Sequence, residues 1–264
     1  MRIPYYHVDS FTDELFAGNP AGVCILESFP SPKTMQQIAA ENRHSETAFV
    51  VRRPDGDFDL RWFTPEVEDD LCGHATLAAA HVLAINGQKS WPLRFHTCSG
   101  VLGVDRDGDE YVMDFPARPP QPCKPPDGLL RALGLDKAEV MKSERDYLVI
   151  VDRETTVKTL SPNIRDLAKF DIGIGGVIVT APADSRDLDY VVRFFPPSVG
   201  IDEDPATGSI QCTLAPYWAS RLGKNEFRVR QLSPRGGKMR SALAGDRVKI
   251  AGAARLYLRG EIEV

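Results

Sequence analysis

The hydrophobic pattern along the chain is clearest over residues 73–86, where nearly every position is apolar. The segment reads GHATLAAAHVLAIN, and its polar positions before the terminal Asn are His74, Thr76 and His81. A helix that is apolar on almost all sides is a buried helix. Gly87 follows at the place where a left-handed helix cap belongs. The pattern therefore predicts a central, buried helix over residues 73–86.

Apolar or alternating runs of strand length surround this helix. They predict strands over residues 3–9, 21–26, 47–51, 58–63, 93–104 and 111–115. Ser31 and Pro32 suit the N-cap and the first helical position, so a short helix is predicted from there to about Asn42.

The same order of features returns half a chain later. Arg61 begins an Arg-aromatic-Phe strand end that runs through a proline turn and an acidic segment into the helix at residue 73. Arg193 begins a matching unit that leads to a second apolar helix, predicted over residues 208–222. The offset of 132 (193 − 61) is half of the 264 residues. A repeat of this length predicts two lobes with one plan.

The second lobe is predicted to repeat the elements of the first. Its expected elements are a strand over 147–151, a helix over 161–170, strands over 176–181 and 190–195, and the helix over 208–222 with a bend at Pro216. Residues 117–128 hold five prolines and are interpreted as the linker. We therefore expect an α+β protein with an N-terminal lobe over 1–118 and a C-terminal lobe over 119–264, whose last strand can return to the first lobe.

Composition narrows the classes of partner. A formal net charge of −5 without a basic tract argues against nucleic acid, which demands clustered Lys and Arg. No apolar run approaches the roughly 20 residues that span a bilayer, and the N-terminus lacks the pattern of a secretory signal. Five cysteines without CxxC spacing fit reduced thiols. The sequence predicts a cytoplasmic protein with a small-molecule or protein partner and no membrane.

The starts of the two apolar helices are candidate sites for a substrate carboxylate. Helix N-termini present unpaired N–H groups and a positive dipole, and Gly73 and Gly208 would let a ligand approach the backbone. His74 and Asp204 lie at these two ends, one in each lobe, and are candidate acid/base groups. Ser209 is a candidate ligand hydroxyl. Each residue also has a structural interpretation, as a turn glycine, a backbone donor or a helix cap.

Glu46 is the candidate proton carrier. The internal repeat at an offset of 130 (176 − 46) sets it against Gly176, so the two halves differ at this position. A carboxylate in a partly apolar cleft between the lobes would have a raised pKa, which suits a general acid/base. The alternative is a solvated Glu at a strand end.

Thiol and metal chemistry are less favoured by the sequence. Cys72 precedes the first helix, but the matching position of the second half is Pro205, so a two-thiol racemase would lack its second thiol. Cys72 is therefore interpreted as a small buried side chain. The histidines show no HxxxH or HxH spacing on one element, and no metal site is predicted. They are His7, His44, His74, His81 and His96.

Several motifs together resemble the PhzF-like family, the phenazine biosynthesis-like proteins. The motifs are FTDELFAGNPAGVCIL, HSETAFV, RWFTPEVEDDLCGHATLAAA, DEDPATGS and SPRGGKMR. The resemblance implies the diaminopimelate-epimerase-like fold, in which each of two lobes wraps strands around a central helix. It implies a proton-shuttling role for Glu46, and substrate-binding or acid/base-assisting roles for Gly73, His74, Asp204, Gly208 and Ser209. It also implies a homodimer that needs no cofactor.

Two functions from different classes follow. The first is a cofactor-independent isomerase or epimerase that moves a proton on a small carboxylate-bearing substrate. The alternative is a non-catalytic protein-interaction module on the same fold, which a large apolar surface patch would favour.

Overall fold

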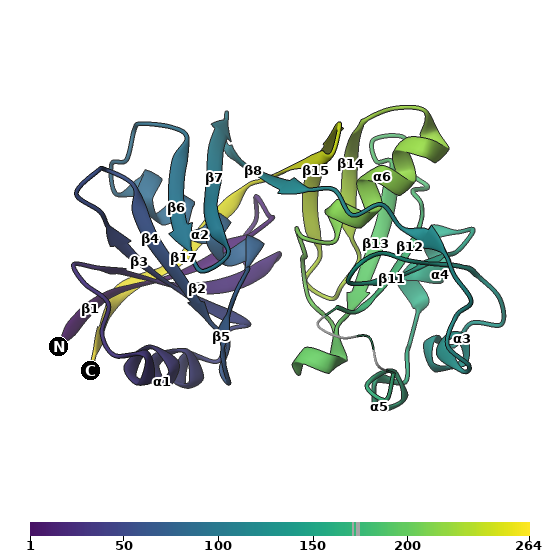
Figure 1. Ribbon diagram of the computed structural model, residues 1–264, viewed down its shortest axis with the longest axis horizontal. Coiled ribbons are helices and arrows are strands. Elements are labelled where there is room, and N and C mark those ends of the chain that lie inside the picture. Colours follow the sequence, from purple (N-terminus) through teal and green to yellow (C-terminus); the bar gives the residue numbers. More distant parts are fainter. Residues whose placement is uncertain (171, 173–174) are drawn as a thin grey trace. The chain divides into compact units, whose positions relative to one another are not determined.

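A computed structural model describes residues 1–170, 172 and 175–264, and the chain forms two compact units (Figure 1). Unit 1 comprises Met1–Asp114 and Ala251–Val264, and unit 2 comprises Phe115–Ile250. In the described part of the chain, no helix is both long enough and apolar enough to cross a membrane.

Unit 1 is built from strands around one long helix. Its elements are β1 (Arg2–Ser10), β2 (Asn19–Leu26), α1 (Pro32–Asn42), β3 (Glu46–Arg52), β4 (Phe58–Phe63), β5 (Glu68–Asp69), α2 (Gly73–Ile85), β6 (Leu93–Thr97), β7 (Gly100–Asp107), β8 (Glu110–Pro116) and β17 (Ala254–Glu263). β17 pairs with β1 in antiparallel fashion, so the end of the chain belongs to the same unit as its beginning.

Unit 2 repeats this plan with shorter helices. Its elements are β9 (Gln121–Pro122), α3 (Leu129–Leu133), β10 (Glu139–Lys142), β11 (Tyr147–Ile150), α4 (Glu154–Thr159), α5 (Ile164–Leu167), β12 (Val177–Pro182), β13 (Tyr190–Phe195), a 3-10 turn (Pro197–Val199), α6 (Gln211–Leu222), β14 (Glu226–Gln231), β15 (Gly237–Ala244) and β16 (Arg247–Gly252).

The pairing of strands follows one order in both units. In unit 1 the pairs β1/β2, β2/β3, β3/β4, β4/β6 and β6/β7 alternate antiparallel, parallel, antiparallel, parallel, antiparallel. In unit 2 the pairs β10/β11, β11/β12, β12/β13, β13/β14 and β14/β15 alternate in the same way. The repeat inferred from the sequence is thus a repeat of sheet topology.

Helix α2 is buried along most of its length, as its missing polar face predicts. Residues from His74 to Leu83 are buried except the half-buried His81. The helix ends with Gly87 at φ +97°, where Gly87 N–H bonds the Ala84 carbonyl and Gln88 N–H bonds the Leu83 carbonyl. These two bonds form a Schellman motif, so the predicted glycine cap is confirmed.

Helix α6 begins at Gln211, three residues later than the sequence pattern predicts. The preceding residues form a tighter turn, because Gln211 N–H bonds the Gly208 carbonyl and Cys212 N–H bonds the Ser209 carbonyl. Pro216 lies inside α6 and cannot donate to the carbonyl of Cys212. That carbonyl accepts the N–H of Arg118 at 2.8 Å instead. The bend expected at Pro216 stays a prediction.

Two predicted elements are wrong in detail. The single strand over 93–104 is the hairpin β6–β7, which turns before Gly100 at φ +103°. The helix over 161–170 is absent as such. Ser161 and Pro162 do not start it, because Asn163 is the cap and its side chain accepts the Asp166 N–H of the short helix α5. In unit 1, by contrast, Ser31 caps α1 with Pro32 in its first turn, as predicted.

Candidate active site

Glu46 is the first residue of β3 and lies opposite Ala21 of the parallel strand β2. Its side chain is 10% exposed, an unusual degree of burial for a carboxylate. β3 is buried over its first five residues, so strand packing rather than solvent fixes where this side chain lies. The interpretation of Glu46 as a solvated strand-end residue is therefore wrong.

His74 lies in the first turn of α2 and is also buried. Desolvation by burial lowers the pKa of His74 to about 3, the electrostatic effect of His44 acts in the same direction, and a hydrogen bond to the Pro20 backbone opposes them. The imidazole is therefore neutral at pH 7 and has one N–H and one lone pair. Ser10 Oγ donates to the His74 carbonyl at 2.8 Å and holds the turn against β1.

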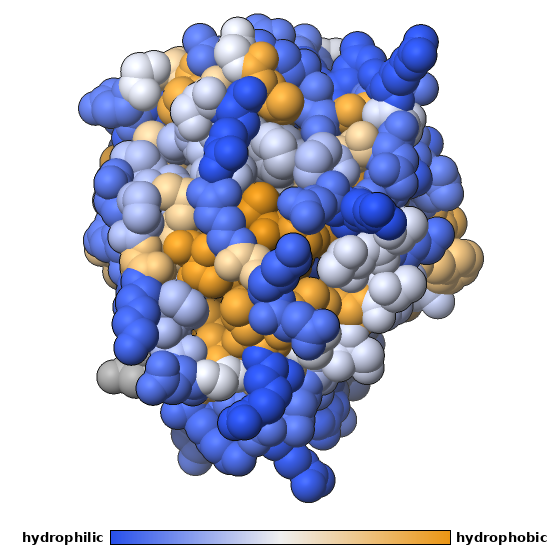
Figure 2. Space-filling view, turned by 90° about the vertical axis from the view of Figure 1, so that its right-hand side faces the viewer, coloured by the Kyte–Doolittle hydropathy of each residue, from blue (hydrophilic) through white to orange (hydrophobic). Residues whose placement is uncertain are grey.

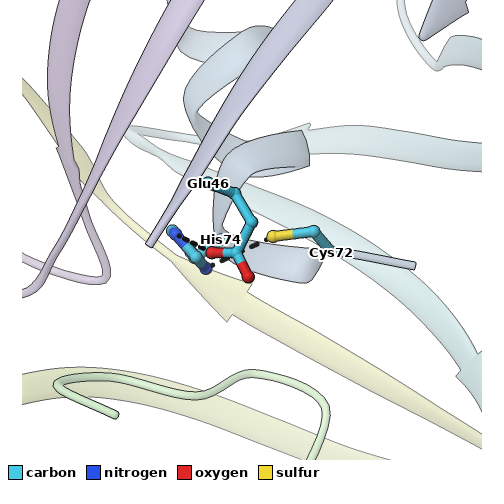
Figure 3. A group of neighbouring side chains, drawn as sticks. All are labelled: Glu46, Cys72 and His74. Atoms are coloured by element: carbon cyan, nitrogen blue, oxygen red, sulfur yellow. Dashed lines mark hydrogen bonds and ion pairs between the residues drawn. The ribbon is translucent and has the colours of Figure 1, made fainter. Parts of the chain in front are cut away.

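Glu46 and His74 meet inside unit 1 (Figure 3). Oε2 of Glu46 lies 3.2 Å from Nε2 of His74. The two atoms are buried and their approach lacks the alignment of a hydrogen bond. The contact therefore places a carboxyl group and an imidazole where both can reach one small group, which is the geometry that proton transfer requires.

Cys72 joins this pair from the residue that precedes α2. Its Sγ lies 3.4 Å from Nδ1 of His74, so the ring has the thiol on one nitrogen and the carboxylate at the other (Figure 3). Cys72 is buried, as predicted, but it is a neighbour of the candidate acid/base groups and not only a filler of the core. The sequence contained the signal, since a thiol and an imidazole two residues apart flank one helix start.

Gly73 lies between these two side chains, at the first residue of α2. A Cβ placed there would meet only the Met113 methyl group, at 4.0 Å, among the atoms of the described chain. The backbone in front of Gly73 is therefore open, and Cys72 supplies no side-chain cap to the helix. Backbone N–H groups of the first turn are suited to an anionic group of a ligand.

Asp204 lies in unit 2, in the segment before α6, and is buried. Its carboxylate accepts the hydroxyl of Thr207, and its backbone N–H bonds the Phe194 carbonyl. Gln231 holds the loop from the other side, because its amide donates to the Asp204 carbonyl at 2.6 Å and accepts the Thr207 N–H at 2.8 Å. The sequence pattern did not reveal Gln231, which lies 27 residues away at the end of β14.

Gly208 and Ser209 follow this loop and form the turn that enters α6. Gly237 approaches the same segment so closely that a Cβ on it would lie 2.6 Å from Cβ of Ala206. The loop is thus packed closely against β14 and β15. Of the predicted residues, the structure groups Glu46, Gly73 and His74 in unit 1, and Asp204, Gly208 and Ser209 in unit 2.

The position that matches Glu46 in unit 2 has no room for a side chain. Thr47 pairs with Phe63, and Val177 pairs with Phe195, so Gly176 is the equivalent of Glu46. A Cβ on Gly176 would lie 2.6 Å from the Phe194 ring and 2.8 Å from the Phe195 carbonyl. The difference seen in the sequence therefore has a structural cause. In unit 2 the Phe194 ring fills the space beside Gly176, whereas unit 1 has the Glu46 carboxylate at the equivalent position.

Comparison with known proteins gives matches along nearly the whole chain. The family model described as phenazine biosynthesis-like protein matches residues 8–260. An uncharacterized isomerase of Pseudomonas aeruginosa is 50% identical over 265 residues, with 100% of each chain covered. A crystal structure of a PhzF-family phenazine biosynthesis protein from Enterococcus faecalis has a TM-score of 0.95 and 42% identity, with 100% of each chain covered.

A more distant likeness concerns the fold alone. A hydroxyproline epimerase from Agrobacterium vitis has a TM-score of 0.64 at 11% identity, with 99% of this chain and 92% of that chain covered. Together the solved structures confirm the α+β, diaminopimelate-epimerase-like fold that the sequence resemblance predicted.

Proposed function

The chain belongs to the phenazine biosynthesis-like protein family, and from this we propose that it is a cofactor-independent isomerase or epimerase in which Glu46 transfers a proton on a small carboxylate-bearing substrate. The family supports the class of reaction, since a relative that is 50% identical is named an isomerase. The residue roles rest on the geometry of the site.

The observation that carries the proposal is the buried contact between Glu46 and His74. A carboxylate at 3.2 Å from a neutral imidazole has little water around it, so its proton affinity responds to the ligand instead of to bulk solvent. Glu46 as carboxylate removes a proton from one substrate carbon and becomes a carboxylic acid. The acid then returns a proton to another carbon, or to the other face of the same carbon, and the carboxylate is regenerated.

His74 assists this transfer without changing its charge. Its neutral ring can donate or accept a hydrogen bond at the substrate atom where charge develops. Gly73 and the first turn of α2 are proposed to bind an anionic group of the substrate through backbone N–H groups. Asp204, Gly208 and Ser209 are proposed as the second set of acid/base-assisting and substrate-binding groups, on the loop that Gln231 holds.

The experiment that tests the proposal needs no knowledge of the pathway. The protein is incubated in D₂O with small unsaturated amino and hydroxy carboxylates, and NMR detects deuterium that enters a C–H position. Glu46→Gln keeps the size of the side chain but cannot exchange a proton, so it should abolish the exchange. Glu68→Gln, at the exposed first residue of β5, is the matched control and should exchange at the rate of the unsubstituted protein. Exchange by Glu46→Gln at that rate would refute the proposal.

The proposal also includes a cytoplasmic homodimer. Hydrophobic side chains gather in the middle of the face shown in Figure 2 and are bordered by hydrophilic ones, which is the pattern of a surface that a partner covers. Sedimentation equilibrium should give twice the chain mass of 29.2 kDa. The same surface would also serve the rival function of an interaction module. That rival explains neither the burial of Glu46 nor its contact with His74.

A further inference from the structure

Three different kinds of metal ligand meet at the start of α2. The carboxylate of Glu46, the thiol of Cys72 and the imidazole of His74 each offer one ligand atom within 4.8 Å of the other two, and all three residues are buried (Figure 3). They come from two elements that are far apart in the sequence, β3 and the entry of α2. A search for metal-binding spacing on a single element, such as HxxxH, cannot find this group.

We propose that Glu46, Cys72 and His74 form a binding site for Zn²⁺. Zinc binds thiolate sulfur at about 2.3 Å, imidazole nitrogen at about 2.0–2.1 Å and carboxylate oxygen at about 2.0–2.2 Å. Ligand atoms of a tetrahedral site therefore lie roughly 3.5 Å apart. A single ion would bind one of the two ring nitrogens of His74. One ligand atom of each residue lies within 4.8 Å of the other two, so side-chain movements of about 1 Å, with the backbone unchanged, would bring the three atoms to the separations of a tetrahedral site.

The chemistry of the three ligands selects the ion. Mg²⁺ and Ca²⁺ prefer sites made of oxygen atoms, whereas a mixed sulfur, nitrogen and oxygen set suits zinc and its spectroscopic substitute Co²⁺. Three protein ligands leave the fourth tetrahedral position for water or another small ligand. The site therefore has the composition of a zinc site with an open position.

The backbone around the three residues is already fixed. Ser10 Oγ bonds the His74 carbonyl at 2.8 Å, and Thr76 Oγ1 bonds the Cys72 carbonyl at 2.5 Å. β3 fixes Glu46 by its pairing with β2. Binding of a metal ion would thus cost little conformational entropy of the three residues, because the fold already holds them close together.

Occupation by zinc would have one consequence that rests on the proposed function. An ion bound to the Glu46 carboxylate removes the group that carries the proton. Zinc should therefore abolish deuterium exchange by the active protein, and a chelator should restore it. The binding experiment below requires no substrate, so failure of the proposed function and failure of the zinc site give different results.

The test uses full-length, tag-free protein in which Cys98→Ser and Cys123→Ser remove the two thiols that are not fully buried. Co²⁺ is added under anaerobic conditions and the absorption spectrum is followed, with Zn²⁺ added afterwards as competitor. We expect one Co²⁺ per chain, a thiolate-to-cobalt charge-transfer band in the near ultraviolet, and tetrahedral bands in the visible that Zn²⁺ removes. Cys72 is the ligand whose contribution the charge-transfer band reports directly.

Two alanine variants in this background separate the site from other thiols. Cys72→Ala should lose the charge-transfer band and weaken Zn²⁺ binding at least about 100-fold, because loss of an outer hydrogen-bond partner alone costs about 10–100-fold. Cys212→Ala, which removes a buried thiol in unit 2, should bind as the background does. Circular dichroism confirms that both are folded. Absence of the thiolate band in the background protein, or equal Zn²⁺ affinity in the two alanine variants, would overturn the zinc site.

Discussion

Arg193 and Glu203 form two parallel charge-assisted hydrogen bonds in unit 2. Nε bonds Oε1 and Nη2 bonds Oε2, each at 2.7 Å, and the side chains are only 11% and 16% exposed. Nη1 of Arg193 also donates to the Leu160 carbonyl at 2.6 Å. One guanidinium thus ties β13 to the segment that precedes Asp204 and to the residue after α4.

The same device exists in unit 1. Arg61 bonds both carboxylate oxygens of Glu68, at 2.7 and 2.6 Å. Each arginine also lies over the phenylalanine two residues later, Phe63 or Phe195. The Arg-aromatic-Phe repeat of the sequence therefore encodes an ion pair that fixes the turn after a strand in each unit.

The first prediction concerns the strength of these pairs. Glu203→Gln should lower the free energy of unfolding by about 2–4 kcal/mol, because it leaves a largely buried guanidinium without its anion. Glu68→Gln should cost less than about 1 kcal/mol, because the unit 1 pair is 28% and 37% exposed. Urea unfolding followed by circular dichroism measures both. Equal losses of unfolding free energy in the two variants would show that burial does not determine how strongly the ion pair stabilises the fold.

The second prediction uses the repeat-related glycines. Gly176→Ala should cost about 1–3 kcal/mol or more, because its Cβ would lie 2.6 Å from the Phe194 ring. Gly73→Ala should leave stability within about 0.5 kcal/mol, since its Cβ meets only Met113 at 4.0 Å. If the first turn of α2 binds substrate, Gly73→Ala should still reduce deuterium exchange. A folded Gly73→Ala protein with full exchange would remove Gly73 from the binding site.

The third prediction is a pH dependence of stability from His81. Desolvation by burial, with Arg255 and Arg106, lowers the pKa of His81 to about 4, and Nδ1 lies 3.1 Å from the Tyr111 hydroxyl. Between pH 6.5 and about 4 the unfolded chain binds a proton that the folded protein does not. Stability therefore falls as the pH falls through this window, by at most about 1.4 kcal/mol per pH unit.

His81→Asn tests this pH dependence because its amide can replace Nδ1 but does not titrate. Urea unfolding at pH 7 and pH 5 should show a smaller drop for His81→Asn than for the unsubstituted protein. His74 is present in both and cancels in the comparison. An identical drop would mean that His81 does not couple protonation to folding.

The fourth prediction concerns the loop that carries Asp204. Gln231→Leu leaves the Thr207 N–H and the Asp204 carbonyl without their buried partner, at a cost of about 1–3 kcal/mol for each group. Gln231→Glu retains the acceptor but places a carboxylate at a fully buried position facing the Asp204 carbonyl, so it should cost more than Gln231→Leu. Thermal unfolding of the two variants gives the order. A loss of less than about 1 kcal/mol for Gln231→Leu would contradict the role of these two bonds.

The elements of the fold that the sequence predicted well are those with strong local signals. The helix expected over 73–86 is observed as Gly73–Ile85. A helix that is apolar on almost all sides is stable only when it is buried in the core. The strand over 190–195 matches β13. The helix over 161–170 was expected from the repeat of the first lobe, but Asn163 caps only the short helix α5 there.

The candidate site was predictable in its residue types but not in its contacts. The repeat singled out Glu46, and the structure shows why unit 2 differs there, since Phe194 fills the space. No local pattern states that Glu46 reaches His74, because that contact depends on how β3 packs beside α2. The contact of Cys72 with His74 was missed although the two residues flank one helix start, whereas the contact of Gln231 depends on a residue 27 positions away.

The pairing of β17 with β1 sets an order for folding during synthesis. Arg2 lies opposite Glu263 and Ser10 opposite Ala254, so the sheet of unit 1 joins residues on either side of the whole of unit 2. Unit 2 is a continuous segment, Phe115–Ile250, so all of it is synthesised before β17. The sheet of unit 1 can therefore close only after every residue of unit 2 has been synthesised, and until then β1 lacks its partner β17 and presents an open edge there.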